Sequence, residues 1–188
     1  MLLPALHAHP EGLTSMKEFI WRLIARLLAR PAIADLIIRR AQRTPYQHIM
    51  SADGTEMYMG RWWLLNPYDR DTHKARFRWL PWSVRVHHIM RADQDRDLHD
   101  HPWDARTVIL RGAYLEERLL PDGLPATTAI ERQPGDTATL RYGEFHRIEA
   151  VSAGGVFTLF ITSPWRGEWG FLVGSEKVHW RDYTGERP

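Results

Sequence analysis

Apolar residues in the first part of the chain recur three or four positions apart. This spacing predicts an amphipathic helix, and its apolar residues are Phe19, Ile20, Leu23, Ile24, Leu27 and Leu28. Ser15 and Glu18 have the spacing of a capping box, in which both side chains bind backbone N–H groups at a helix start. Pro31 ends or kinks this helix and is suited to open a second one. The second helix continues an apolar face to about residue 43 through Ile33, Leu36 and Ile37.

From residue 54 the pattern changes to the period of two that is typical of strands. Segments rich in β-branched and aromatic residues alternate with turn residues. They predict strands at 56–65, 75–80, 82–90, within 106–120 on both sides of Gly112, and at 127–133, 137–140, 145–151, 156–162, 168–173 and 177–180. Many short strands at close intervals predict a β-sandwich or a β-barrel.

The segment 82–90 carries two alternating sets of side chains. One set comprises Val84, Val86, His88 and Met90, and the other comprises Arg85, His87 and Ile89. We expect the first, more apolar set to face the protein interior, so that His88 points inward and His87 points outward.

The change of period divides the chain into a helical segment at 1–45 and a β domain at 46–188. We interpret the apolar face of the helical pair as packing on the β domain or on a second subunit, with a homodimer as the candidate assembly. Arg22, Arg26 and Arg30 fall between the apolar residues, so a basic amphipathic element on a membrane surface is the alternative. Packing is favoured because apolar helix faces usually bury against protein.

Composition and charge exclude several classes of function. The 188 residues are 44% hydrophobic and 26% charged, as in a globular protein, and no apolar run is long enough to span a bilayer. The net charge of +2 and the interleaving of acidic and basic residues argue against a nucleic-acid partner. The absence of cysteine excludes disulfides, thiolate ligands and a cysteine nucleophile, and is compatible with the cytoplasm, the expected location.

The strongest chemical signal is the pair His99 and His101. Side chains two positions apart in a strand lie on the same face, so both imidazoles can point at one metal ion. His146 supplies a third imidazole later in the chain. Neutral imidazole binds zinc, iron, copper and nickel well, and three such ligands leave coordination positions open, as in catalytic metal sites.

These motifs resemble those of the cupin superfamily. The second cupin motif matches through Gly135-Asp136, Gly143 and His146, although Arg141 stands where proline is usual. The resemblance covers roughly residues 54–183 and extends to a group of small bacterial and phage cupin-like proteins, through 88–93, 147–148 and 168–171. It implies a mainly β fold, a single jelly-roll barrel preceded by the helical segment.

The first motif departs from the cupin pattern. Cupins usually carry a glutamate after the second histidine, but Ala105 and Arg106 occupy that region, with Asp104 nearby. Three neutral imidazoles leave the charge of a divalent ion uncompensated, so the site should attract an anionic ligand or hydroxide. Asp104 as a fourth, oxygen ligand is a less favoured alternative, beside a role in the turn after Pro102.

The ligand set is similar to that of cupins without the glutamate, which include thiol and ring-cleaving dioxygenases. This resemblance implies a mononuclear metal enzyme that acts on a small polar molecule, with one divalent ion: iron first, and zinc, nickel or manganese as alternatives. A zinc hydrolase or isomerase is a related possibility, in which the ion lowers the pKa of bound water. A non-catalytic ligand-binding or sensory cupin and a purely structural barrel are the other hypotheses.

Four residues are predicted to contact the substrate: His88, Arg106, Tyr114 and Glu116. Tyr114 and Glu116 share a strand face, although an outward, salt-linked Glu116 is equally compatible with the pattern. Arg106, like Arg111, could hold a carboxylate or phosphate in bidentate fashion, whereas arginines on strands are more often solvated. Plain core packing is the preferred role, and aromatic pocket walls are the alternative, for Trp103, Trp165 and Trp169.

Overall fold

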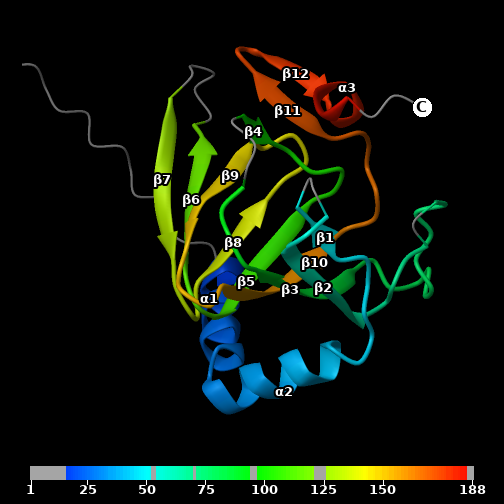
Figure 1. Ribbon diagram of the computed structural model, residues 1–188. Coiled ribbons are helices and arrows are strands. Elements are labelled where there is room, and N and C mark those ends of the chain that lie inside the picture. The colour runs from blue at the N-terminus through cyan, green and yellow to red at the C-terminus, as the bar shows by residue number, and fades with distance from the viewer. Residues whose placement is uncertain (1–15, 52–53, 70, 94–96, 121–125, 186–188) are drawn as a thin grey trace, which may run out of the picture.

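The described residues form two antiparallel sheets of six strands each, a pair of helices at the N-terminal end and a short helix α3 (Trp180–Thr184) near the C-terminal end (Figure 1). The computed structural model describes residues 16–51, 54–69, 71–93, 97–120 and 126–185. Ser15 of the predicted capping box lies outside these residues, and Glu18 instead pairs with Arg106. The prediction of a mainly β fold is confirmed.

The strands follow the order β1-β2-β3-β10-β5-β8 in the first sheet and β12-β11-β4-β9-β6-β7 in the second. The first sheet comprises β1 (Ile49–Met50), β2 (Met57–Leu65), β3 (Ser83–Ile89), β10 (Val156–Thr162), β5 (Ala105–Arg111) and β8 (Thr137–Leu140). The second comprises β12 (Glu176–His179), β11 (Gly170–Val173), β4 (Leu98–His99), β9 (His146–Val151), β6 (Tyr114–Leu119) and β7 (Thr127–Arg132). Within the described ranges no strand ladder joins the two sheets, so the expected closed barrel is corrected to a sandwich.

One predicted strand is absent from the described residues. The segment 75–80 forms only an isolated bridge between Ala75 and Tyr68. The reason is Asn66, whose side chain is buried and takes the place of a strand partner. Its amide nitrogen donates to the carbonyl oxygens of Phe77, Leu80 and Trp82, and its oxygen accepts from the Phe77 N–H group. These bonds satisfy the backbone of the segment in a loop.

The molecule has two apolar clusters, one on each face of the first sheet. Between the two sheets lie Ile89, Ile109, Tyr114, Ile148 and Val156. The opposite face of the first sheet packs on the helices through Val86, Val108, Leu110 and Leu159. Both faces of the first sheet are therefore covered, one by the second sheet and the other by helices.

The helices α1 (Met16–Leu28) and α2 (Pro31–Ala41) face the sheet mainly with small residues, and of the predicted apolar faces Leu28 and Ile37 pack there. Ala25, Ala34 and Ala41 are buried, together with Ile38. The stripe on α1 is exposed instead, at Phe19, Ile20, Leu23, Ile24 and Leu27. Alanine allows close approach of helix and sheet, and this decides which side of α1 is buried. Among the described residues, none of the helices is long and apolar enough to cross a membrane.

Both faces of the first sheet are covered, and the orientation of β3 is the opposite of the expected one. Val86 packs under the helices, so His88, on the same side of the strand, also lies on the outer face. The His88 ring stacks on Phe157, and its Nε2 atom lies 2.9 Å from the Gly154 carbonyl oxygen. His87 is the buried histidine of the pair and stacks on Phe160. The inward placement predicted for His88 is thus wrong.

Candidate metal centre

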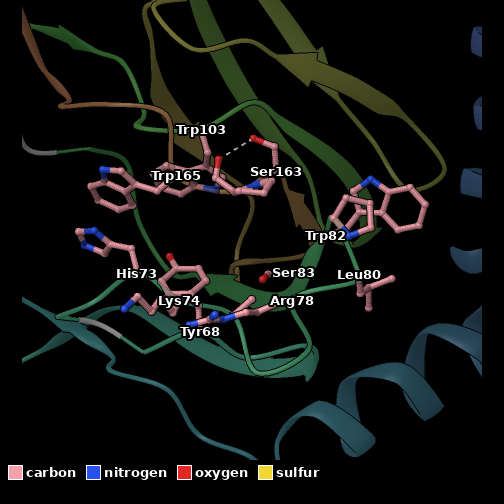
Figure 2. A pocket seen from close by; sticks show the side chains of 13 residues that line it. Tyr68, His73, Lys74, Arg78, Leu80, Trp82, Ser83, Trp103, Ser163 and Trp165 are labelled. Atoms are coloured by element: carbon pink, nitrogen blue, oxygen red, sulfur yellow. Dashed lines mark hydrogen bonds between the residues drawn. The ribbon is translucent and has the colours of Figure 1, made fainter.

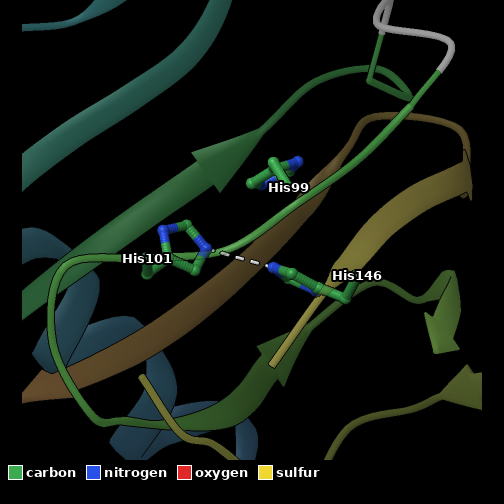
Figure 3. Close-up of side chains that lie close together, drawn as sticks. All are labelled: His99, His101 and His146. Carbon is green, nitrogen blue, oxygen red and sulfur yellow. Dashed lines mark hydrogen bonds between the residues drawn. The ribbon is translucent and has the colours of Figure 1, made fainter. Parts of the chain in front are cut away.

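The three predicted metal ligands come together in the second sheet, at the ends of β4 and β9 (Figure 3). His99 ends β4 and lies directly opposite His146, the first residue of β9, in the antiparallel register. His101 follows two residues after His99 and turns its ring toward both. A turn with Gly143 at φ +84° precedes β9, a conformation that favours glycine, and Glu144 accepts the Arg141 N–H group across it.

The geometry of the cluster suits a single ion. One nitrogen from each of His99, His101 and His146 lies within 4.8 Å of the others. The Nε2 atoms of His101 and His146 are 3.1 Å apart, and the dashed line in Figure 3 joins them. Two nitrogens that share an ion at about 2.0–2.1 Å have a separation of this size when their angle at the ion lies between a right angle and a tetrahedral one.

Glu116 orients His146. Its Oε1 atom lies 2.9 Å from His146 Nδ1, which makes Nδ1 the natural site of the ring proton and leaves the Nε2 lone pair for the cluster. Burial opposes ionisation of Glu116, but the hydrogen bond and charge of His146 and the charge of Arg118 outweigh it and lower the pKa to about 2. Arg132 also donates to this carboxylate, so Glu116 is ionised at neutral pH.

Burial keeps the other two imidazoles neutral. It lowers the pKa of His99 to about 4, with a smaller contribution from the charge of His146. It lowers the pKa of His101 well below the usual value, and the charges of His99 and His146 add to the effect. His99 Nδ1 is buried and has no hydrogen-bond partner among the described residues. Neutral rings and an unpartnered nitrogen fit a divalent metal ion.

The two aspartates of the motif are not part of the cluster. Asp100 is fully buried and accepts hydrogen bonds from the Gly170 N–H group and from Lys177 Nζ, which ties β4 to β11 and β12. Asp104 accepts from the Tyr142 N–H group and pairs with Arg166. The alternative of Asp104 as an oxygen ligand is therefore not supported, since both of its oxygens are engaged elsewhere.

The four predicted substrate residues separate into two groups. Glu116 and Tyr114 point between the sheets, and Glu116 touches the cluster itself. Burial, together with the charge of Glu116, raises the pKa of Tyr114. Arg106 faces the helices instead, where its Nη2 atom lies 2.6 Å from Glu18 Oε1. His88 is also on the outer face, so the structure does not bring Arg106 and His88 to the cluster.

Sequence reasoning missed two interior residues of β3. Arg85 and His87 occupy the face that was expected to point outward, and both are buried. His87 stacks on Phe160, whose ring centroid is 6.2 Å from that of His101. The signal was present in the alternation of β3, but a strand covered on both faces does not reveal which face is inner.

A cavity of about 180 Å³ is lined by Trp103 and Trp165, and by none of the three histidines (Figure 2). Trp165 forms one wall and stacks on His73 and Trp103, with ring-centroid distances of 3.7 Å and 6.0 Å. Trp103 also approaches His101, with ring centroids 5.0 Å apart. The indole of Trp103 is thus shared between the cavity and the histidines, which fits the aromatic wall rather than plain core packing for Trp103 and Trp165.

Comparison with known proteins finds likeness only among solved structures. No family model matches the chain, and no curated protein matches it. A cupin-2 conserved barrel domain protein from Rhodopseudomonas palustris is 16% identical, with a TM-score of 0.44 over 70% of this chain and 77% of the other. A cupin-2 domain protein from Rhodospirillum rubrum is 15% identical, with a TM-score of 0.47 over 69% and 75%.

Oxalate decarboxylase from Bacillus subtilis, described with Mn(II) centres, is 11% identical, with a TM-score of 0.47. The match covers 77% of this chain but 32% of the decarboxylase, so this chain spans about a third of that protein. The solved structures to which the chain is similar thus include cupin-2 domain proteins, the superfamily that its histidine and glycine motifs resemble.

Proposed function

We propose that His99, His101 and His146 bind one divalent metal ion and that the protein is a mononuclear metal enzyme acting on a small polar molecule. The observation that carries the proposal is the convergence of three imidazole nitrogens within 4.8 Å. Three protein ligands leave positions for a substrate, as catalytic sites require. When bound, the ion supplies Lewis acidity and, if it is iron, the capacity to activate oxygen.

The residues around the cluster have separate tasks in this proposal. Glu116 holds the proton on His146 Nδ1 and keeps Nε2 available. Trp103 and Phe160 exclude water on the side of His101, since their ring centroids lie 5.0 and 6.2 Å from the centroid of the His101 ring. The cavity beyond Trp103 is the approach for a small molecule.

Elemental analysis of protein purified without a metal-chelating tag tests the metal site. We expect about one equivalent of a divalent metal, with iron as the first expectation. The His99→Ala/His101→Ala variant should lose it. A His73→Ala/His179→Ala variant is the matched control, because both of its histidines lie outside the cluster, and it should keep the metal.

The outcomes separate the hypotheses. Iron, followed by oxygen uptake with small thiols or acids, supports a dioxygenase-like enzyme. Zinc or nickel favours hydrolysis, isomerisation or ligand capture. A stable metal site without turnover would make the protein a non-catalytic binding or sensory cupin. A wild-type protein that takes up no metal even after reconstitution contradicts the proposal.

A further inference from the structure

Arg85 is a cation held inside the sandwich. It lies in the middle of β3 with 2% of its surface exposed. Its guanidinium carbon lies within 6.0 Å of five ring centroids, those of Trp63, Trp103, Phe160, Tyr68 and Tyr46. Aromatic faces stabilise a cation, but they do not replace the hydrogen bonds that its N–H groups lose on leaving water.

The hydrogen bonds of Arg85 are incomplete. Nη1 donates to the Tyr68 hydroxyl at 3.2 Å. Nε and Nη2 are both buried and have no hydrogen-bond partner among the described residues. A buried charge without a counter-charge is strongly unfavourable. Arg106, Arg111 and Arg118 differ from Arg85 in this respect, because each has a carboxylate partner.

The two unpartnered nitrogens are not a random pair. Nε and Nη2 form one edge of the planar guanidinium, and their N–H bonds run parallel. That edge matches the two oxygens of a carboxylate, which it binds in bidentate fashion. Since Tyr68 already occupies Nη1, the free edge of Arg85 is a preformed site for one planar, singly charged acid group.

The site lies next to the histidine cluster and the cavity. Trp103 and Phe160 contact both Arg85 and His101. Trp103 also lines the cavity, together with Tyr68 (Figure 2). Two more buried nitrogens in this region, Trp103 Nε1 and His87 Nε2, lack partners among the residues described. Buried nitrogens without a hydrogen-bond partner therefore lie together on one side of the cluster.

We propose that the Nε–Nη2 edge of Arg85 binds the carboxylate of a small organic acid whose other end reaches the three histidines. The substrate class of the site is then a small carboxylic acid. The position of the ligand's other end rests on the proposed metal centre. The carboxylate subsite itself depends only on Arg85 and can be measured in metal-free protein.

Binding of malonate, with malonamide as its neutral analogue, tests this inference. Quenching of tryptophan fluorescence reports on the site, because Trp63 and Trp103 lie against Arg85. We expect malonate to bind wild-type protein at least about tenfold more tightly than malonamide. Arg85→Gln should lose this preference, and Arg85→Lys should keep part of it, because lysine retains the charge without the bidentate edge.

Arg111→Gln is the matched control, since Arg111 lies in the same sheet, on β5, but pairs with Asp35 at the helices. It should bind malonate like the wild type. Equal binding of malonate by wild type and Arg85→Gln overturns the inference. If the Arg85 variants do not fold, the wild type decides: equal thermal shifts with malonate and malonamide overturn the subsite as well.

Metal loading separates this inference from the proposed function. The same titrations are run on metal-free and Mn(II)-reconstituted protein. Arg85-dependent malonate binding in a protein that takes up no metal supports the subsite and contradicts the metal centre. Metal uptake with malonate binding that does not depend on Arg85 supports the metal centre and contradicts the subsite.

Discussion

At the scale of single residues, Glu116 is the side chain on which the candidate site depends most. It was expected to touch a substrate, but it holds the outer nitrogen of His146 and is itself held by Arg118 and Arg132. A carboxylate in this position fixes the tautomer and the orientation of the ligand. The candidate site therefore has no carboxylate ligand in place of the glutamate that is missing from the first motif. Glu116 instead contacts the candidate ligand His146.

Glu116→Gln should weaken divalent metal binding by about 10- to 100-fold, because glutamine keeps the size of the side chain but loses its charge. Isothermal titration with Mn(II) or Zn(II) measures the change. Glu117→Gln is the control, since the neighbouring side chain pairs with Arg147 and Thr127 outside the cluster. Unchanged metal affinity in Glu116→Gln would mean that His146 is oriented without this carboxylate.

The stability of the metal-free protein should fall as the pH is lowered from 7 to 4. His99 has a pKa of about 4 in the folded protein and an ordinary value of 6.5 when unfolded, so between these values the unfolded chain binds more protons. His99 alone should contribute a loss of up to about 3 kcal/mol, and His101, whose pKa is also lowered by burial, adds to it. Glu116 adds a second loss of stability only when the pH falls below the pKa that this group has in the unfolded chain and approaches its folded pKa of about 2.

Urea denaturation at several pH values measures this dependence. A His99→Gln variant, which cannot titrate at this position, should show a flatter profile between pH 7 and 4. A wild-type profile without slope in that window would show that His99 is not buried as a neutral ring in metal-free protein.

At the scale of elements, α1 is attached to the first sheet by a polar contact as well as by alanines. Arg106 projects from β5, pairs with Glu18 and lies 4.8 Å from the ring of Trp21. The same arginine was expected to bind substrate. It cannot serve both tasks, because the outer face of β5 is turned toward the helix.

Arg106→Gln should therefore lower the free energy of unfolding by about 1–2 kcal/mol, a value reduced by the partial exposure of Glu18. Metal content and malonate binding should stay unchanged. A double-mutant cycle with Glu18→Gln, read by urea denaturation, isolates the pair. Lost malonate binding with unchanged stability would return Arg106 to the substrate site.

At the scale of the whole molecule, α1 leaves an apolar stripe on the surface. Phe19, Ile20, Leu23 and Leu27 are exposed, although they form the pattern from which packing was predicted. Ala25 and Leu28 make the packing of α1 on the sheet, so the exposed stripe remains available for a second copy. Homodimerisation through this stripe stays a prediction.

Sedimentation equilibrium tests it. We expect wild-type protein to dimerise, and Leu23→Ser/Leu27→Ser to be monomeric with little change in stability, because both leucines are half exposed. An Ala25→Leu variant is the contrast. Ala25 is fully buried, so overpacking should lower the free energy of unfolding by about 1–3 kcal/mol. A wild-type monomer at high concentration contradicts the dimer, and salt-sensitive binding to anionic vesicles would favour the membrane alternative.

The sequence alone determined the mainly β class of the fold and the three histidines that form the cluster. Alternation specifies strands locally, because side chains of a strand point to opposite faces whatever its neighbours are. The spacing of His99 and His101 predicts one face for the same reason, although β4 ends at His99. Gly135 lies in the turn before β8, and Gly143 lies in the turn before His146, which begins β9. These features are local, so they can be read without the partners.

The tertiary structure alone decided which face is inner. Alternation says that His87 and His88 point in opposite directions, but not which of them meets the second sheet. The helices cover one face of the first sheet, so the more apolar face of β3 points to the helices and not to the second sheet. Arg85 and His87 therefore lie between the sheets, whereas Arg106 and His88 lie on the helix side. Burial depends on contacts between segments far apart in the chain, and no local pattern carries that information.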